Sequence, residues 1–275
     1  MRPLPEQVIL VTGATDGLGK ALCADLAGRG ATLLLHGRDD DRGKRTIGEI
    51  REATGNERLH WHRADLSSLD EVREMAERIV HERDRLDAFV NNAGIGTTLP
   101  GHGERMESRD GYELRFAVNY LAGFLLARRL QELIVRAAPS RIVNVSSAGQ
   151  APIDFDDVML ERGYNGVQAY CQSKLAQVML TLDLADELAD AGVTANCLHP
   201  ATYMPTKMVT DAGVSPASSL EEGAAATLRL VADPELDGVT GRYFDGQTES
   251  RALPQAYEPE ARRRLRELSE RLVAT

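Results

Sequence analysis

Cysteine and long apolar runs are scarce in this chain. Its 275 residues include three cysteines, Cys23, Cys171 and Cys197, in unrelated spacings and without a CxxC pair, so neither a disulfide framework nor a zinc knuckle is indicated. This cysteine usage is typical of a reducing compartment, and we expect a cytoplasmic protein. No stretch approaches the roughly 18 apolar residues of a membrane-spanning helix, and the residues before Val8 show no export signal.

Basic residues are outnumbered, and lysine is rare among them. The chain has 42 acidic against 32 basic residues, a net charge of -10. This excess repels phosphate backbones and acidic lipid, so we expect neither nucleic acid nor a membrane surface as a partner. Only four of the bases are lysine, namely Lys20, Lys44, Lys174 and Lys207. A lysine that falls in a motif is therefore informative.

Short apolar runs alternate with longer amphipathic segments along the whole chain. We expect strands near residues 7–12, 31–37, 58–63, 86–92, 141–147, 193–199 and 241–246, and helices that include 18–29, 69–82, 112–138 and 168–191. Alternating strands and helices predict a doubly wound parallel sheet covered on both faces. No linker or repeat divides the chain, so we expect one α/β domain over residues 1–275.

Two segments of irregular pattern, residues 148–166 and 200–220, each follow an expected strand. Loops beyond the carboxyl ends of parallel strands form the ligand crevice in such folds, so we expect these two segments to be the walls of a substrate pocket. Residues 259–273 read as an Arg/Glu-rich helix with a leucine stripe, which favours a surface helix packed on the core over a partner-binding helix.

The first expected strand runs directly into the sequence TGATDGLG at residues 12–19. Glycines permit a sharp turn and a close approach of the backbone, and the helix that follows offers unpaired N–H groups to a pyrophosphate. This position between a strand and a helix predicts a dinucleotide site. The residues that we expect to contact the dinucleotide here are Gly13, Thr15, Asp16, Gly17, Leu18 and Gly19.

Arg38 follows the second expected strand, where many dinucleotide folds place an acid that binds the ribose 2'-hydroxyl. An acid repels a 2'-phosphate, whereas a planar guanidinium can bind it. The sequence therefore predicts a preference for NADP(H), with NAD(H) as the alternative. Asp16, in the glycine loop, argues against this preference because its charge is unfavourable to a phosphate.

Further motifs follow the later strands: Asp65-Leu66, Asn91-Asn92-Ala93-Gly94, Asn119, Ser146-Ser147, and Tyr170-x-x-x-Lys174. With the glycine loop, these motifs resemble the short-chain dehydrogenase/reductase family over about residues 8–207, most closely its retinol-dehydrogenase-like and protochlorophyllide-reductase-like branch. The resemblance implies a Rossmann-type fold, an NAD(P)-dependent enzyme acting on a small-molecule alcohol or carbonyl, and a homodimer or homotetramer. It also implies cofactor contacts from Asp65, Leu66, Asn92, Ala93, Gly94, Tyr170, Lys174 and Pro200.

Hydride transfer between a nicotinamide and a carbonyl carbon requires a proton donor at the carbonyl oxygen. Tyr170 is the candidate, and Lys174, four residues later on the same helix face, favours its anion. In the family that the chain resembles, Lys174 also holds the nicotinamide ribose, Ser147 orients the substrate oxygen, and Asn119 holds a water that links Lys174 to solvent.

The sequence contains a second Y-x-x-x-K pair, Tyr203 and Lys207, although chance would give about 0.1 such pairs at this composition. Pro205 lies inside the second pair and breaks the helical register that places both side chains on one face. We therefore assign Tyr203 and Lys207 to the substrate loop and keep Tyr170 and Lys174 as the catalytic pair.

Three departures from the family pattern leave questions open. Ser147 and Tyr170 are 23 residues apart (170 − 147), more than the usual spacing, so the insert between them must loop out and return. Ser146 is the alternative serine, because strand alternation lets only one of the pair face the site. Pro200-Ala201 replaces the usual Pro-Gly, which leaves the contacts to the nicotinamide amide open.

We expect no metal site. The acids Asp154, Asp156 and Asp157 read as a solvated loop, and His60 and His62 read as a surface pair without a third ligand at metal spacing. Cys171 is expected to serve only in packing.

The function predicted is an NADP(H)-preferring carbonyl reductase or alcohol dehydrogenase. Met204, Met208 and Val209 favour a lipophilic substrate, or a lid that packs on itself. The alternative is a catalytically silent cofactor-binding regulator or scaffold, against which the intact set of catalytic residues argues. A sugar-nucleotide epimerase or dehydratase would need a differently spaced glycine loop and a larger C-terminal substrate domain.

Overall fold

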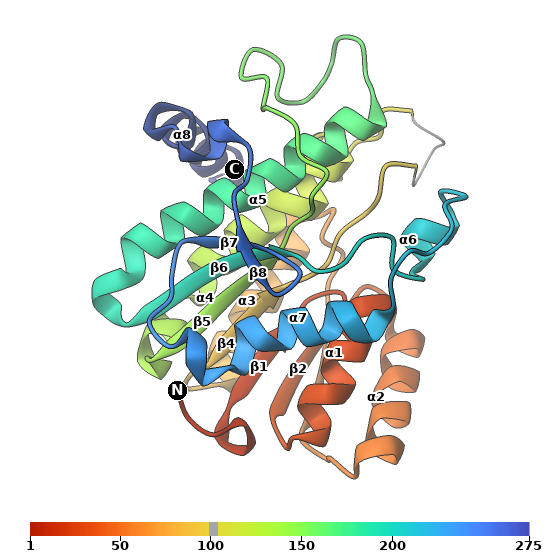
Figure 1. Cartoon of the computed structure of the whole chain (residues 1–275), viewed down its shortest axis with the longest axis vertical. Coiled ribbons are helices and arrows are strands. Elements are labelled where there is room, and N and C mark those ends of the chain that lie inside the picture. Colours follow the sequence, from red (N-terminus) through yellow and green to blue (C-terminus); the bar gives the residue numbers. More distant parts are fainter. Residues whose placement is uncertain (99–103, 275) are drawn as a thin grey trace.

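A single eight-stranded sheet runs through the protein, whose computed structural model describes residues 1–98 and 104–274 (Figure 1). Strands β1 to β7 are parallel, β8 is antiparallel to β7, and the order is β3-β2-β1-β4-β5-β6-β7-β8. The strands are β1 Val8–Val11, β2 Thr32–Gly37, β3 Leu59–Arg63, β4 Ala88–Asn91, β5 Ser140–Val145, β6 Val193–His199, β7 Arg242–Asp245 and β8 Thr248–Ser250. The predicted Rossmann-type parallel sheet and its seven strands are confirmed, and β8 is additional.

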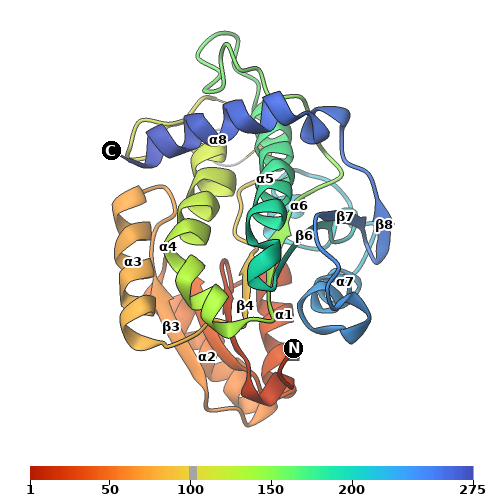
Figure 2. The ribbon, with the colours of Figure 1, turned by 90° about the vertical axis from the view of Figure 1, so that its left-hand side faces the viewer.

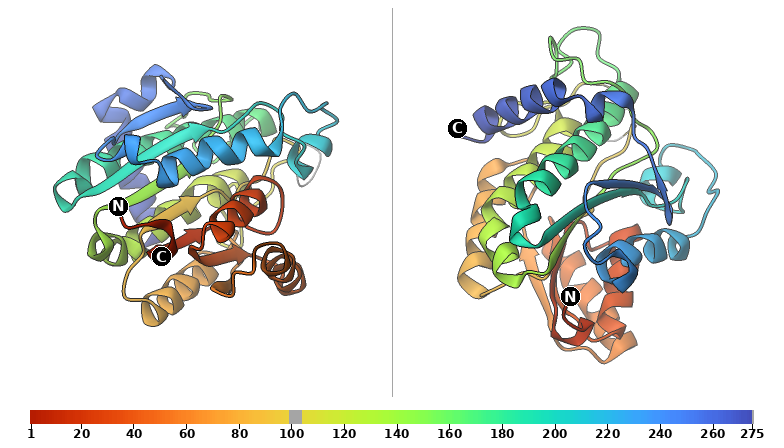
Figure 3. Two further views of the ribbon diagram at one scale, coloured as in Figure 1. Left: turned by 60° about the horizontal axis from the view of Figure 1, so that its bottom comes forward. Right: turned by 60° about the vertical axis from the view of Figure 1, so that its left-hand side comes forward.

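Helices cover both faces of the sheet (Figures 1 and 2). On one face lie α1 Gly17–Gly28, α2 Asp40–Thr54 and α7 Leu220–Ala232, and on the other lie α3 Leu69–Glu82, α4 Ala122–Ala137 and α5 Gly166–Leu188. The remaining helices are α6 Lys207–Thr210, α8 Pro259–Val273 and the short turns η1 Leu4–Glu6, η2 Phe116–Leu121, η3 Ala189–Ala191, η4 Pro234–Leu236 and η5 Pro254–Tyr257. Figure 3 shows the same two layers from further sides.

The central strand β1 is apolar throughout because both of its faces are buried. Along β1, Leu10 belongs to the core under α3, α4 and α5, whereas its neighbours Ile9 and Val11 belong to the core under α1 and α7. Successive side chains of a strand point to opposite faces, so one short run of residues supplies both cores.

Strands β1 and β4 pair at the centre of the sheet, while β2 and β5 continue it in opposite directions. This reversal of strand order is the point at which doubly wound sheets bind ligands, beyond the carboxyl ends of the strands. The loops that follow β1, β4, β5 and β6 therefore meet around one crevice.

The helix expected over residues 112–138 differs in its first turns. A π-helical segment, η2, precedes α4 and contains Asn119. The Glu113 carboxylate accepts a hydrogen bond of 2.7 Å from the backbone N–H of Phe116, the first residue of this segment. π-helical turns are rare in proteins overall, and those that occur often lie at functional sites. The helix expected from residue 168 begins two residues earlier, because the Asn165 side chain accepts hydrogen bonds from the N–H groups of its first turn.

Helix α8 lies across α4 and α5 (Figure 2). Its residues Leu265 and Ser269 are buried, the Ser269 hydroxyl is 2.7 Å from the Tyr120 hydroxyl of η2, and Arg262 donates to Asp183 of α5 over 2.6 Å. The predicted packing of residues 259–273 on the core is confirmed. Within residues 1–98 and 104–274, no helix is both long and apolar enough to cross a membrane.

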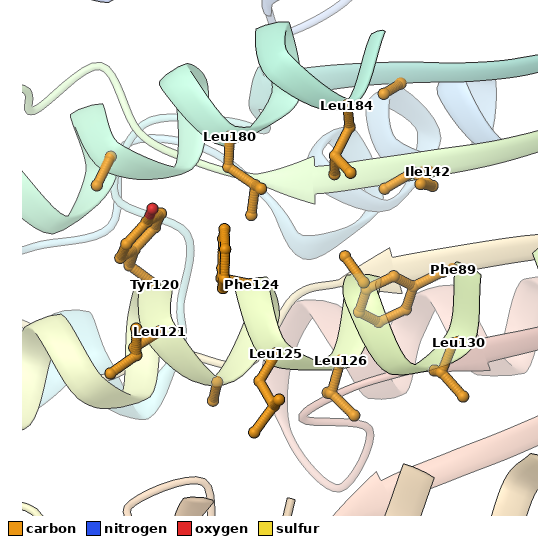
Figure 4. Close-up of a cluster of buried hydrophobic side chains, with 14 of the residues drawn as sticks. Phe89, Tyr120, Leu121, Phe124, Leu125, Leu126, Leu130, Ile142, Leu180 and Leu184 are labelled. Atoms are coloured by element: carbon orange, nitrogen blue, oxygen red, sulfur yellow. The ribbon is translucent and has the colours of Figure 1, made fainter. Parts of the chain in front are cut away.

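Phe89 of β4 lies in the larger core cluster, with Leu126, Leu130 and Ile142 around it (Figure 4). We predict that Phe89→Ala lowers the free energy of unfolding by about 3–5 kcal/mol, because it removes apolar contacts and leaves a cavity that the rigid sheet cannot close. Urea unfolding measures the loss. The control is Val80→Ala, at a side chain of α3 that is 40% exposed. Similar small losses for both variants would contradict the prediction.

Candidate active site

The glycine loop forms a cradle that only glycine can build. Gly13 and Gly17 have φ values of +68° and +48°, which side chains disfavour. A Cβ at Gly19 would lie 2.2 Å from the backbone oxygen of Gly13, so α1 could not start this close to β1 with any other residue there. Asp16 caps α1 by accepting from the N–H of Gly17 over 2.8 Å. The cradle at the N-terminus of α1 fits a pyrophosphate.

His36 is a functional residue of this cradle that sequence reasoning missed. Its Nδ1 accepts from the N–H of Gly13 over 3.2 Å, and its Nε2 lies 3.1 Å from the backbone oxygen of Ala64. Burial lowers the pKa of His36 to about 4, so the ring is neutral and Nε2 carries the proton that Ala64 accepts. The ring thereby joins the glycine loop to the segment before Asp65. The available signal was a polar residue inside an otherwise apolar strand.

Two arginines lie close to the end of β2, where the sequence predicts contact with the 2'-phosphate of the cofactor. Arg38 is exposed directly after β2, and no ion pair of Arg38 occurs among the described residues. Asp16, which argued against a 2'-phosphate, is paired with Arg42 over 3.0 Å, so its charge is compensated. At Gly37 a Cβ would lie 3.1 Å from the side chain of Thr15, which places the end of β2 against the glycine loop.

Asp65 and Leu66 follow β3 as expected, with Leu66 buried and Asp65 half-buried. Burial alone would raise the pKa of Asp65, but hydrogen bonds from the N–H and the hydroxyl of Ser67, together with Arg109, lower it below its usual value. The side chain is therefore a carboxylate that can only accept hydrogen bonds.

The loop after β4 is fixed to the glycine loop. The side-chain amide of Asn92 donates to the backbone oxygens of Thr12 and Gly13 over 2.8 and 3.2 Å, and the N–H of Ala93 donates to the Thr12 hydroxyl over 3.0 Å. Gly94 then passes close to the catalytic candidates, since a Cβ there would lie 3.3 Å from Asn119 Oδ1 and 3.6 Å from Lys174 Nζ.

The structure brings Ser147, Tyr170 and Lys174 together. Burial raises the pKa of the Tyr170 hydroxyl, and its hydrogen bond with Ser147 opposes this rise. Nζ of Lys174 lies 5.6 Å from the centre of the Tyr170 ring, and burial lowers its pKa to about 7. Ser147, rather than Ser146, faces the tyrosine, because the Ser146 hydroxyl donates to the backbone oxygen of Lys174 over 2.8 Å.

Asn119 completes this group from the π turn. It is fully buried, and its carboxamide donates to the Ser173 hydroxyl over 3.0 Å while its Oδ1 accepts from the N–H of Ile95 over 2.8 Å. Ser173 in turn donates to the backbone oxygen of Tyr170 over 2.7 Å. Asn119 thus connects the loop after β4 to the start of α5. Its role in holding a water stays a prediction.

The loop after β6 crosses over the crevice. It follows the buried Pro200, and its Thr206 and Met208 lie where side chains at Gly17 and Gly96 would otherwise be, 2.9 and 2.5 Å from the respective Cβ positions. The positions of Tyr203 and Lys207, the second Y-x-x-x-K pair, do not suit catalysis. Tyr203 is exposed, and α6 begins only at Lys207, so the pair shares no helix face.

A shallow hollow lies at the start of α5, less than two turns before Tyr170. It is formed by the loop after β4, the end of the insert and the loop after β6, the last two being the expected pocket walls. Its lining residues are Thr97, Thr98, Tyr164, Asn165, Gly166, Val167 and Asp211.

The expectation of a surface pair at His60 and His62 is wrong for His62. That ring is only 4% exposed because α3 covers it, with Glu82 of α3 at 3.9 Å from Nε2. In the part of the chain that the structure describes, no three His, Cys, Asp or Glu side chains form a cluster that could hold a metal.

Known proteins resemble this chain in sequence and in fold. A family model described as short chain dehydrogenase matches residues 7–215. Retinol dehydrogenase 13 of Homo sapiens is 36% identical over 288 residues, covering 98% of this chain and 85% of the human protein. A crystal structure from Mycobacterium paratuberculosis is similar at a TM-score of 0.79, 27% identity and coverage of 98% and 94% of the two chains. A short chain dehydrogenase from Escherichia coli CFT073, complexed with NADPH, has a TM-score of 0.72, 28% identity and coverage of 88% and 97%.

We predict that His36 makes the protein lose stability in acid. Its folded pKa of about 4 lies below the ordinary value of 6.5, so the unfolded chain binds the proton first. The contribution of the neutral ring is complete above pH 6.5 and is lost as the pH falls towards 4, up to about 3 kcal/mol. Urea unfolding of His36→Gln at several pH values should show a weaker pH dependence than the wild type. His81→Gln, at an exposed histidine of α3, should match the wild type, and equal slopes for all three would contradict the prediction.

Proposed function

The chain belongs to the short-chain dehydrogenase/reductase family, and from this premise we propose that it is an NADP(H)-preferring oxidoreductase of lipophilic alcohols or carbonyls. At the coarser level it is an NAD(P)-dependent dehydrogenase or reductase that acts on alcohol or carbonyl groups. The observation that carries the proposal is the meeting of Tyr170, Lys174 and Ser147 beside the glycine cradle.

The reaction divides between cofactor and protein. A bound nicotinamide supplies the hydride in reduction and accepts it in oxidation. The Tyr170 hydroxyl donates a proton to the carbonyl oxygen in reduction and takes the proton of the alcohol in oxidation. Ser147 donates a hydrogen bond to the same oxygen and orients it. The charge of Lys174 stabilises the tyrosinate, which burial of Tyr170 disfavours.

Preference for NADP(H) is supported at the adenosine end. Arg38 is exposed and makes no ion pair among the described residues, so its guanidinium is free for a 2'-phosphate. Arg42 compensates the Asp16 carboxylate nearby. Similar structures from Shigella flexneri and Escherichia coli, each 28% identical, were determined with NADP and NADPH.

A lipophilic substrate is supported by the walls of the crevice. Met204 packs in the core against Gly223 of α7 and does not line the crevice. Met208, however, lies against Gly96, and Val167 is 56% exposed at the hollow before Tyr170. The human relative is named for retinol, an apolar primary alcohol. A homodimer or homotetramer and a cytoplasmic location stay predictions.

We expect Tyr170→Phe to lower kcat by about 10²–10⁴-fold, because the variant lacks the group that transfers the proton. NADPH absorbance on a panel of alcohols and carbonyls measures turnover, and NADPH fluorescence measures binding, which should be unchanged. The matched control is Tyr203→Phe, which removes the hydroxyl of the other Y-x-x-x-K pair and should keep full activity. If wild type binds NADPH but turns over no member of the panel, the cofactor-binding regulator is favoured instead.

Arg38→Asp should reverse the cofactor preference. The introduced carboxylate repels a 2'-phosphate and can bind a ribose hydroxyl, so the ratio of kcat/KM for NADPH to that for NADH should fall at least about tenfold, equivalent to about 1.4 kcal/mol. Arg45→Asp, the same charge change on an exposed residue of α2, separates this contact from the effect of overall charge. An unchanged ratio for Arg38→Asp would rule out the assigned contact.

A further inference from the structure

Lys174 has a buried side-chain nitrogen without a carboxylate partner. The residue is 4% exposed, and its Nζ donates to two neutral acceptors, the backbone oxygen of Val145 at 3.0 Å and Oε1 of Gln177 at 2.8 Å. Within residues 1–98 and 104–274 no Asp or Glu forms an ion pair with it. The charged form of this lysine therefore depends on the two carbonyl oxygens.

Gln177 is a polar residue at a fully buried position. It lies one turn after Lys174 on α5, is fully buried, and its Nε2 has no hydrogen-bond partner in the described structure. An unsatisfied buried donor costs about 1–3 kcal/mol, whereas methionine would fill a similar volume without that penalty. Folding stability alone does not favour glutamine here.

The orientation of this carboxamide follows from its neighbour. An ammonium has three donors and no acceptor, so the flipped carboxamide would set the NH₂ group against Nζ, donor facing donor. Placing Oε1 towards Lys174 is attractive and leaves Nε2 unpaired. We attribute the unpaired Nε2 to this contact, because Gln177 can accept from Lys174 at Oε1 only in this orientation.

We propose that Gln177 is a positioning residue that keeps Lys174 in its ammonium form and thereby promotes the tyrosinate of Tyr170. The inference rests on the proposed function, because it assigns Gln177 a part in the same proton transfer. It extends that function by naming a residue that contacts neither substrate nor reacting atoms.

Tyr170 and Lys174 titrate as a coupled pair. After one proton is lost, the pair is either tyrosinate with ammonium, which can accept the alcohol proton, or neutral tyrosine with neutral amine, which cannot. Burial lowers the pKa of Lys174 and raises that of Tyr170, and both shifts favour the neutral form. The hydrogen bond to Oε1 opposes them because it is stronger to an ammonium than to an amine.

Among the described residues, no titratable group takes over this role, and the other acceptor at Nζ is the backbone oxygen of Val145. The titratable groups that face the pair are Cys171 beside Tyr170 on α5 and His199 at the end of β6, with Asp245 of β7 next to His199. Burial lowers the pKa of His199, so its ring is neutral at neutral pH and adds no charge. Burial raises the pKa of Cys171, so its thiol stays protonated.

The test compares Gln177→Met with Gln172→Met. Gln172 is a matched control on the same helix: it is fully buried, it also has one unpaired polar atom, and its Nε2 donates to Val158 of the insert over 2.7 Å instead of contacting Lys174. Two pH titrations are measured for wild type and both variants. One is kcat for alcohol oxidation, and the other is tyrosinate absorbance, with a Tyr170→Phe version of each protein subtracted to isolate Tyr170.

In Gln177→Met we expect the acid limb of kcat and the Tyr170 absorbance midpoint to move upward by about one pH unit, so that oxidation at neutral pH falls about tenfold. Its urea midpoint should equal or exceed that of wild type, a result that a merely structural residue would not give. Gln172→Met should leave both pH midpoints in place. Unmoved midpoints in a folded Gln177→Met would overturn the proposal.

Two further outcomes are decided by the same design. If Gln177→Met does not fold, Gln177→Asn, whose shorter carboxamide retreats from Nζ, is measured instead, and its midpoints must move in the same direction. If wild type oxidises no alcohol, the proposed function fails, while the absorbance titration of Tyr170 still supports or overturns the contribution of Gln177.

Discussion

The active site depends on keeping a positive charge at Lys174, where burial disfavours charge. Several elements are arranged around this requirement. The backbone oxygen of Val145, at the end of β5, accepts a hydrogen bond from Nζ, and so does Oε1 of Gln177 on α5. The loop after β4 passes close to Nζ at Gly94, which has no side chain. A lysine at an exposed position would hold its charge more easily. It would then be screened by water and would stabilise a tyrosinate much less.

The same principle of local compensation explains how an acidic protein can receive an anionic cofactor. The net charge of -10 is a property of the whole chain, whereas the cradle presents the N–H groups of the α1 terminus, and the exposed Arg38 follows β2. The one acid in the loop, Asp16, is held by Gly17 and Arg42. Net charge therefore affects the binding of large polyanions. Groups within a few ångströms of the phosphates decide the binding of a single nucleotide.

The features predicted from the sequence are those with a local physical cause. Strands buried on both faces require apolar runs, the turn at Gly13 requires a positive φ, and Tyr170 and Lys174 meet through the helical period. The features that were missed depend on a partner distant in sequence or leave no pattern. His62 is buried only once α3 covers it, whereas the π turn at Asn119 and the three exposed residues of β8 have no pattern that marks them.

The long insert between Ser147 and Tyr170 shows why spacing along the chain is a weak guide to a site. Both ends of the insert are fixed independently of its length. The backbone oxygen of Ser147 accepts hydrogen bonds from Tyr243 of β7 and from Gln150. At the other end, the fully buried Arg115 donates to the Tyr164 hydroxyl over 2.6 Å and to the backbone oxygens of Gly96 and Thr97 over 2.8 Å each, which holds the start of α5 against the loop after β4. With the ends anchored, extra residues change the walls of the crevice and leave the distance between the Ser147 and Tyr170 hydroxyls unaffected.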